Sequence, residues 1–231
     1  MKQVKILILS LTLCFIAFAH LKGQEYFRMS ADYTVKVKRA DGSMNLTRGS
    51  VYYDKNIREL IYRVDYPRKE TWVIADTSLF KFRNDSLIER MTIPSIAEFT
   101  VFHLSLNSGI SDFGLKQSRF KVNKVERRNG STLSYWKIPK ELESTISHVV
   151  VAKKGGHLES VFMVGEDNSV MSKQFYRDYQ MSGAFEFPMK IIQLIPDESG
   201  KNHYQVTEFR NIRINDMGND ALYTYPALPA L

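Results

Sequence analysis

The stretch that decides the fold is residues 49–82, GSVYYDKNIRELIYRVDYPRKETWVIADTSLFKF. It has the pattern of short strands separated by the turn-forming groups DKN, YPRK and DTS. In residues 57–66, one set of alternate positions contains Leu60, Tyr62, Val64 and Tyr66. The other set still contains Ile57 and Ile61. A strand with one wet face alternates more cleanly, so this stretch predicts antiparallel strands with apolar side chains on both faces.

The same pattern continues on both sides of this stretch, with DGS, NG and KKGG as further hairpin signals. The predicted strands are residues 31–40, 44–54, 57–66, 70–75, 79–82, 86–91, 119–128, 132–138, 145–152, 157–164, 170–181, 186–195 and 203–214. One segment, residues 94–106, has apolar residues at helical spacing instead, and it begins with Pro94. Open twisted sheets rarely exceed about ten strands, so a sheet of this size must curl, split or close. A curled sheet has a hollow that the predicted helix can cover.

The first residues have the features of a secretory signal peptide. Lys2 and Lys5 precede the apolar run 6–18, and Ala17 and Ala19 form an A-x-A arrangement. Cleavage after Ala19 or after Gly23 would release one domain, which we delimit as residues 24–231. Lipid attachment at Cys14 is the alternative, although Leu13 before it is bulky and Cys14 lies inside the apolar run. We expect a periplasmic protein that is soluble after processing.

Charge and cysteine content exclude several classes of function. The formal charge is +7; Lys2, Lys5 and Lys22 account for three of these charges, which leaves +4 after Gly23. The basic clusters are short and lie at strand ends, so nucleic acid is not an expected partner. The only cysteine is Cys14, so the mature chain has no disulfide and no thiol nucleophile.

Motifs for catalysis or metal binding are lacking from the sequence. The histidines beyond the signal peptide are not at ligand spacing, and there is no G-x-S-x-G, Walker or dinucleotide pattern. We therefore predict a binding protein rather than an enzyme, with no cofactor and no metal. A hydrolase whose polar site is assembled from distant loops remains a further alternative.

The order of motifs resembles the periplasmic lipoprotein-carrier family (LolA-like) and its lipid-binding relatives. The first matching block is GSVYYD, a strand ending in YP, and WVIADTSLFKF. The second is FKVNKVERRNGSTLSYWKIPK, and the third is HLESVFMVGEDNSVMSKQFYRDY followed by FPMKIIQ and YQVTEFRNIRIND. The resemblance spans about residues 33–226. It implies a half-open barrel formed by a single curled antiparallel sheet of about 11–13 strands, covered by one or two short helices.

This resemblance also implies a function, although the sequence departs from the family pattern in two places. It implies a carrier that shelters acyl chains of lipoproteins or lipids and moves them toward the outer membrane. Its partners would be the cargo, an inner-membrane release complex and an outer-membrane acceptor, and it would act as a monomer. Residues 24–32 are too few for the long first helix of the family. The family's lid-latching arginine has no counterpart at the expected place, and Arg58 and Arg63 are only nearby candidates.

Strand parity and helix spacing give the predicted site. The residues expected to line the cavity are Leu60, Tyr62, Val64, Trp72, Ile74, Phe80, Phe82, Phe162, Val164, Phe175, Met189 and Ile191. Those expected to form the lid are Ile96, Phe99, Phe102 and Leu106. A one-residue slip would turn any of these strands over, so the opposite parity stays open for each. The alternative function is a non-catalytic envelope protein whose half-barrel is filled by its own side chains.

Overall fold

The protein, described by a computed structural model, forms one antiparallel sheet. The structure describes residues 27–75, 77–92, 100–140, 146–183, 185–197, 200–216 and 218–227, so the predicted signal peptide lies outside the described residues. The strands are β1 (Arg28–Lys38), β2 (Met44–Asp54), β3 (Glu59–Tyr66), β4 (Glu70–Ala75), β5 (Ser78–Arg83), β6 (Ser86–Thr92), β7 (Lys121–Arg128), β8 (Ser131–Lys137), β9 (His148–Lys154), β10 (His157–Val164), β11 (Val170–Ser182), β12 (Phe185–Pro196) and β13 (Asn202–Ile214). These strands match the predicted ones closely.

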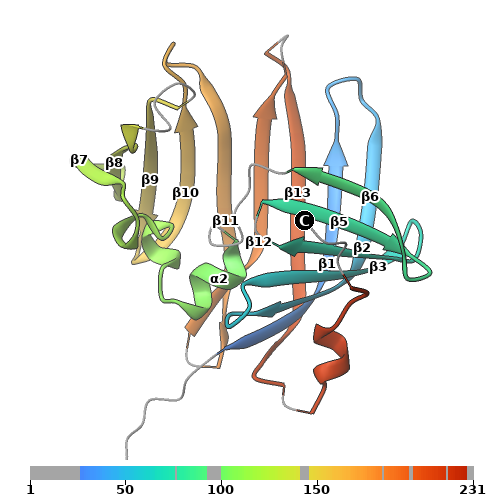
Figure 1. Cartoon of the computed structure of the whole chain (residues 1–231). Helices are drawn as coiled ribbons and strands as arrows, with labels where there is room; N and C mark the ends of the chain where they lie inside the picture. The colour runs from blue at the N-terminus through green and yellow to red at the C-terminus, as the bar shows by residue number, and fades with distance from the viewer. Residues whose placement is uncertain are drawn as a thin grey trace, which may run out of the picture.

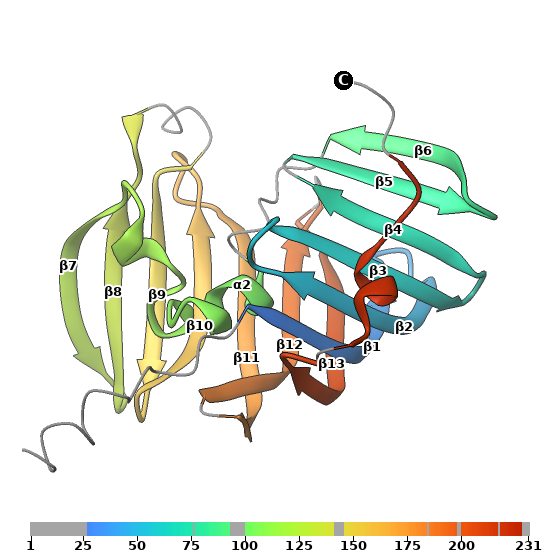
Figure 2. The same ribbon diagram turned by 60° about the horizontal axis from the view of Figure 1, so that its bottom comes forward.

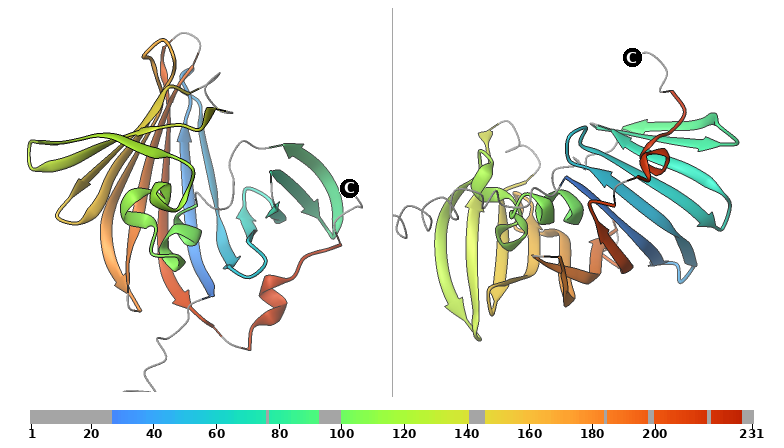
Figure 3. Two further views of the ribbon diagram at one scale, coloured as in Figure 1. Left: turned by 60° about the vertical axis from the view of Figure 1, so that its left-hand side comes forward. Right: turned by 90° about the horizontal axis from the view of Figure 1, so that it is seen from below.

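The thirteen strands follow the order β6-β5-β4-β3-β2-β1-β13-β12-β11-β10-β9-β8-β7. Consecutive strands are neighbours within β1–β6 and within β7–β13, and β1 pairs with β13, so the first and last strands meet near the middle of the sheet (Figure 1). β6 and β7 lie at the two ends of the order. Figure 2 and the right-hand view of Figure 3 show the sheet curled into two wings, with the helix α2 between them. The first wing consists of β1–β6, and the second wing consists of β7–β13. The predicted curled, open antiparallel sheet is confirmed.

Tight turns set the register of the hairpins. Asn129 and Gly130 have φ of 52° and 79°, the pair of positive values that a type I′ turn requires, as the sequence predicts. Gly49 in β2 is needed for another reason. A Cβ built on Gly49 would lie 1.9 Å from the carbonyl oxygen of Arg63 on β3, so a side chain here would force the two strands apart.

Residues 100–118 leave the sheet and cover part of its hollow. They contain α2 (Val101–Leu106) and two 3-10 turns, η2 (Ile110–Asp112) and η3 (Leu115–Gln117). Thr100 is the N-cap: its backbone is extended, and its hydroxyl accepts a hydrogen bond from the His103 amide at 3.4 Å. The first half of the predicted helix, with Ile96 and Phe99, lies outside the described residues.

The chain after β13 packs across the sheet on the side away from α2. We call residues Asp220–Tyr225, which include the 3-10 turn η5 (Asp220–Tyr223), the C-terminal strap. Tyr223 stacks edge-on against Tyr52 with ring centroids 5.4 Å apart, and the Tyr225 hydroxyl donates to Glu59 at 2.7 Å. The predicted irregular end is therefore irregular but firmly packed (Figure 3, left).

Candidate functional site

The strand register defines an inner face, which is the face of the sheet that contacts α2. Directly opposed residues in an antiparallel pair share a face. Tyr53 and Val51 of β2 oppose Leu60 and Tyr62 of β3. Leu60 and Tyr62 in turn oppose Ile74 and Trp72 of β4. The inner face of this wing is therefore a continuous apolar and aromatic surface across three strands.

The helix α2 seats a phenyl ring in this surface. Phe102 is 1% exposed, and its ring centroid lies 5.7 Å from that of Phe187 and 5.4 Å from that of Phe209. Phe187 and Phe209 also contact each other, with centroids 5.5 Å apart. Three rings packed in tilted and edge-to-face geometries gain stability beyond their buried area. Leu106, one turn later on α2, is buried in the same cluster.

A polar contact also ties α2 to the sheet. The Tyr53 hydroxyl and His103 Nδ1 are 2.5 Å apart, and their rings pack edge-to-face with centroids 6.0 Å apart. Tyr53 is fully buried, so this hydrogen bond is sheltered from water. It connects α2 to β2 at the inner face.

The segment after α2 covers the other wing. Leu104 points away from Phe102 and packs with Phe113 and Leu115. These three side chains are 1–3% exposed. They rest on an inner-face cluster from β8–β11 that consists of Trp136, Ile138, Val149, Val151, Leu158, Val161 and Tyr176. Residues 101–115 therefore fill the hollow between the wings with their own side chains.

Seven of the twelve predicted lining residues lie on the inner face. They are Leu60, Tyr62, Val64, Trp72, Ile74, Met189 and Ile191. Leu60 is buried beside α2, and Tyr62, Ile74, Met189 and Ile191 are partly buried against the same cluster. Of the predicted lid residues, Phe102 and Leu106 are buried there, while Ile96 and Phe99 lie outside the described residues. The structure therefore brings these apolar residues together around α2.

The predicted parity of β5 is wrong. Lys81 and Leu79 oppose Trp72 and Ile74, so they share the inner face, and Phe80 and Phe82 point outward. Both phenylalanines are 2–3% exposed and form a separate cluster with Val73, against which Tyr225 of the C-terminal strap packs. The aromatic residues of β5 therefore anchor the strap instead of lining the hollow.

The predicted parity of β10 and β11 is also wrong. Val161 and Tyr176 belong to the inner cluster. Their neighbours Phe162 and Phe175 therefore face outward, where their rings make an edge-to-face contact with centroids 5.8 Å apart. Val164 is on the same outer face, opposite His148. Both faces of these strands carry apolar side chains, and the residues predicted to line the cavity are the ones that face outward.

Several inner-face residues were not among the predicted lining residues, and the sequence contains a signal for one of them. Phe187 lies at an alternate position to the predicted residues Met189 and Ile191, so strand alternation would have placed it on the inner face with them. Phe209 and Tyr33 oppose each other across the β1–β13 ladder, and nothing local in the sequence announces that pairing. Trp136 and Tyr176 could have been found only with the correct parity of their strands.

The inner face becomes charged toward the end of the first wing. The Trp72 indole Nε1 donates to Glu70 Oε2 at 2.7 Å, and Arg83 Nη2 lies 2.6 Å from Glu70 Oε1. Burial raises the pKa of the Glu70 carboxyl, but the hydrogen bonds from Arg83 and Trp72 outweigh burial and hold the pKa below its ordinary value. Lys81 lies over the Trp72 ring, 5.2 Å from its centroid. Trp72 is therefore surrounded by charge on an otherwise apolar surface.

Two tyrosines beneath α2 are kept neutral by their surroundings. Burial raises the pKa of Tyr62 to about 12. Burial, with smaller contributions from Tyr62 and Asp65, also raises the pKa of Tyr33. The rings of the two residues contact edge-to-face with centroids 5.3 Å apart. The Tyr33 hydroxyl is buried with no hydrogen-bond partner in the described part of the chain. The two hydroxyl groups therefore stay uncharged, and they add no charge to the apolar surface beneath α2.

Within the residues that the structure describes, His, Cys, Asp and Glu side chains form no group of three or more that could hold a metal ion. No described helix is long and apolar enough to cross a membrane.

Solved structures with the same architecture come from several bacteria. A LolA superfamily protein from Nitrosomonas europaea matches with a TM-score of 0.58 and 12% identity, over 87% of this chain and 91% of that one. The chain has a LolA-like fold. A DUF1329 family protein from Desulfovibrio piger matches the LolA-like sheet with a TM-score of 0.61 and 12% identity, over 90% and 93% of the two chains.

A third solved structure has the same architecture. A proposed outer membrane lipoprotein-sorting protein domain from Vibrio parahaemolyticus matches with a TM-score of 0.58 and 13% identity, over 86% of this chain and 92% of that one. No family model matches the sequence, and no curated protein matches it. At these identities, the likeness extends to the LolA-like fold and not to the residues of a site.

Proposed function

We propose that this LolA-like protein is a non-enzymatic periplasmic carrier that holds acyl chains of lipoproteins or lipids and moves them toward the outer membrane. The observation that carries the proposal is the way in which the inner face is covered. The short helix α2 lies between the two wings of the open sheet (Figure 2), and its buried side chains pack on the inner face. α2 has six residues, and its apolar side chains occupy the position that a cargo chain would take.

The energetics of exchange support this proposal. Sheltering an acyl chain of about 15 methylenes contributes on the order of 12 kcal/mol at about 0.8 kcal/mol per methylene. Burial of Val101, Phe102 and Leu106 contributes about 5–9 kcal/mol on the same scale of 1.5–3 kcal/mol per side chain. These two quantities differ by about 3–7 kcal/mol. An acyl chain that replaces α2 on the inner face would therefore bind favourably and still be released.

A filled, non-binding half-barrel is the second candidate function, and one observation favours it. Phe102, Leu104 and Leu115 are each no more than 2% exposed, so the hollow is already well packed. In that case residues 101–115 would serve as a permanent core, and the protein would act as a structural or interaction component of the envelope. The proposed partners of the carrier, a releasing complex and an acceptor in the two membranes, would then have no role.

Neighbouring isoleucines on β12 provide a matched test of the carrier. Ile191 packs against the inner clusters, whereas Ile192 opposes Phe175 and Val206 on the outer face. Both are half-buried. We expect Ile191→Glu to abolish uptake of a fluorescent fatty acid, because a carboxylate would stand in the path of the chain. Ile192→Glu should bind the probe as the parent protein does.

Hydrogen exchange separates the two candidate functions directly. The carrier predicts that the backbone amides of residues 101–106 exchange faster once the fatty acid is bound, while the amides of β1 and β13 keep their protection. A protein that takes up no probe and keeps α2 protected would be the filled half-barrel. Mass spectrometry of an organic extract of the detergent-free protein, purified from envelope fractions, would identify cargo bound in the cell.

A further inference from the structure

A notch opens at the rim of the inner face because β3 is shorter than β2. The β2–β3 ladder ends at the pair Arg48–Tyr66, while β2 continues to Met44. The resulting space has a volume of about 420 Å³. Residues 44–47 form one side of it, and Val64, Trp72, Arg68, Glu70 and Arg83 are on the other. We call this space the rim notch.

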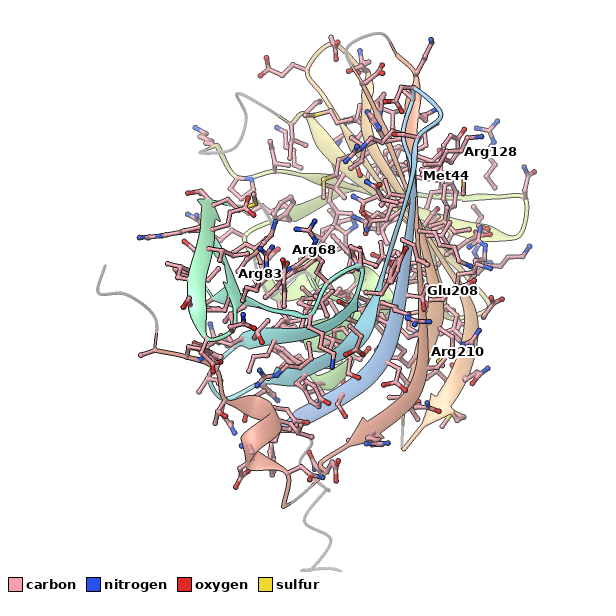
Figure 4. All side chains as sticks on the ribbon, turned by 90° about the vertical axis from the view of Figure 1, so that its right-hand side faces the viewer. Met44, Arg68, Arg83, Arg128, Glu208 and Arg210 are labelled. Atoms are coloured by element: carbon pink, nitrogen blue, oxygen red, sulfur yellow. The ribbon has the colours of Figure 1, made fainter. Side chains whose placement is uncertain are left out.

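The rim notch has a net positive charge, because two arginines and one glutamate line it. Glu70 is the carboxylate of the notch, and it already accepts hydrogen bonds from Arg83 and Trp72. Arg68 also lines the notch, and it has no ion pair or hydrogen bond within the described residues. Figure 4 shows Arg68 and Arg83 on the same side of the molecule. The notch therefore holds one guanidinium group fixed by Glu70 and one guanidinium group available for an anion.

The rim notch continues into the apolar inner face. Val64 and Trp72 line the notch and also belong to that face, and Tyr62 follows on the same side of β3. Leu60 comes next and is buried beside α2. From Val64 to Leu60 the strand spans four residues, or about 13 Å. A charged pocket and an apolar track thus lie end to end on one surface.

We infer that the rim notch binds the phosphate group of a phospholipid, whose acyl chains run along Val64, Tyr62 and Leu60 toward α2. A guanidinium group recognises a phosphate through parallel hydrogen bonds, and an indole with one polar end suits the level between head group and chains. This inference rests on the proposed carrier function and narrows its cargo. An uncharged diacylglycerol, or a diacylglyceryl protein anchor without a phosphate, would leave the available guanidinium group unused.

Competition between two lipids tests the inference in one sample. The protein is incubated with vesicles that contain equal amounts of phosphatidylglycerol and diacylglycerol with identical chains, separated from them, and extracted for mass spectrometry. We expect the parent protein to carry the phosphatidylglycerol in excess. Arg68→Gln should reduce that excess by about fivefold, the scale of one charge-assisted hydrogen bond at a partly exposed site. Arg127→Gln, on the exposed strand β7, is the matched control and should keep the parent ratio.

Each outcome of this competition bears on the inference. Equal uptake of both lipids, unchanged in Arg68→Gln, would overturn the phosphate site and leave the carrier intact. Uptake of neither lipid would overturn the carrier, and with it the assigned cargo. Glycerol phosphate added to the mixture identifies the source of the phosphate. If it displaced the lipid at comparable concentration, the notch would be a site for a free phosphate compound, because the acyl chains would contribute nothing.

Discussion

The two ends of the inner face in the first wing differ in how they are stabilised. Near α2 the surface is apolar and covered: Phe102 fills a pocket between Phe187 and Phe209, away from water. Near β5 the same face carries Trp72 between Glu70, Lys81 and Arg83, whose side chains are partly exposed. One end depends on burial, and the other on charge near solvent. The inner face of this wing thus has a dry end, near α2, and a wet end, near β5.

The largest expected effect tests the dry end. Phe102→Ala should lower the free energy of unfolding by about 3–5 kcal/mol, because it removes a buried ring and leaves a cavity between two others. The urea midpoint at neutral pH measures this change. Trp72→Ala is the matched variant at the wet end, where the residue is only partly buried, and the loss of stability should be less than half as large. Equal losses would mean that the two ends do not differ as described.

A pair of tyrosines sharpens the comparison within the dry end. Tyr53→Phe removes the hydrogen bond to His103 and should cost about 1–2 kcal/mol of stability, because a partly buried hydrogen bond between β2 and α2 is lost. Tyr33→Phe removes a buried hydroxyl that has no partner among the described residues, so it should be neutral or slightly stabilising. Chemical denaturation of both variants under one condition gives the difference. A loss for Tyr33→Phe comparable to that for Tyr53→Phe would contradict this account.

The smallest effect concerns the wet end and depends on pH. The pKa of Glu70 is lowered in the folded protein, so its ionised form stabilises the fold above the unfolded-state pKa of about 4.3. That contribution is lost as the pH falls through the lower folded-state value. We expect Glu70→Gln to cost about 0.5–1 kcal/mol at pH 7, a small value because Arg83 is 42% exposed.

The same Glu70→Gln variant provides its own control. The difference in stability between it and the parent protein should shrink as the pH falls through the lowered folded-state pKa of Glu70, because the parent carboxyl then also becomes neutral. Urea unfolding curves of both proteins at pH 7 and at acidic pH measure how this difference in stability changes. A difference that grew at low pH would show that Glu70 does not act through its charge.

The sequence predicted the strands, the turns and the curl because these depend on local patterns. Asn129-Gly130 specifies its turn through φ alone, and thirteen strands cannot remain a flat sheet. Phe102 and Leu106 were placed correctly for the same reason, since helical spacing puts both on one side of α2.

The face to which a strand turns its side chains was harder to predict. Phe80 and Phe82 are as apolar as any lining residue, but they face outward because Tyr225, far along the chain, packs there. In β11, Phe175 and Tyr176 are adjacent aromatics, and only the pairing of the strands shows which one points inward. When both faces of a strand are apolar, alternation carries no information about which face is inside. The rim notch was not foreseen because it arises from a difference in length between two paired strands.

The pairing of β1 with β13 has a consequence for the order in which the molecule forms. Residues 29–38 pair with residues 204–214, and the Asn215 side chain accepts hydrogen bonds from the backbone amides of Phe27 and Arg28 at 3.0 and 3.2 Å. A chain made from its N-terminus therefore completes twelve strands before the ladder that joins the two wings can close. Contacts so distant in sequence make folding slow, and until then β1 is an open edge. A chain stopped short of β13 would consist of two sheets without a shared centre, exposed to aggregation and to proteases.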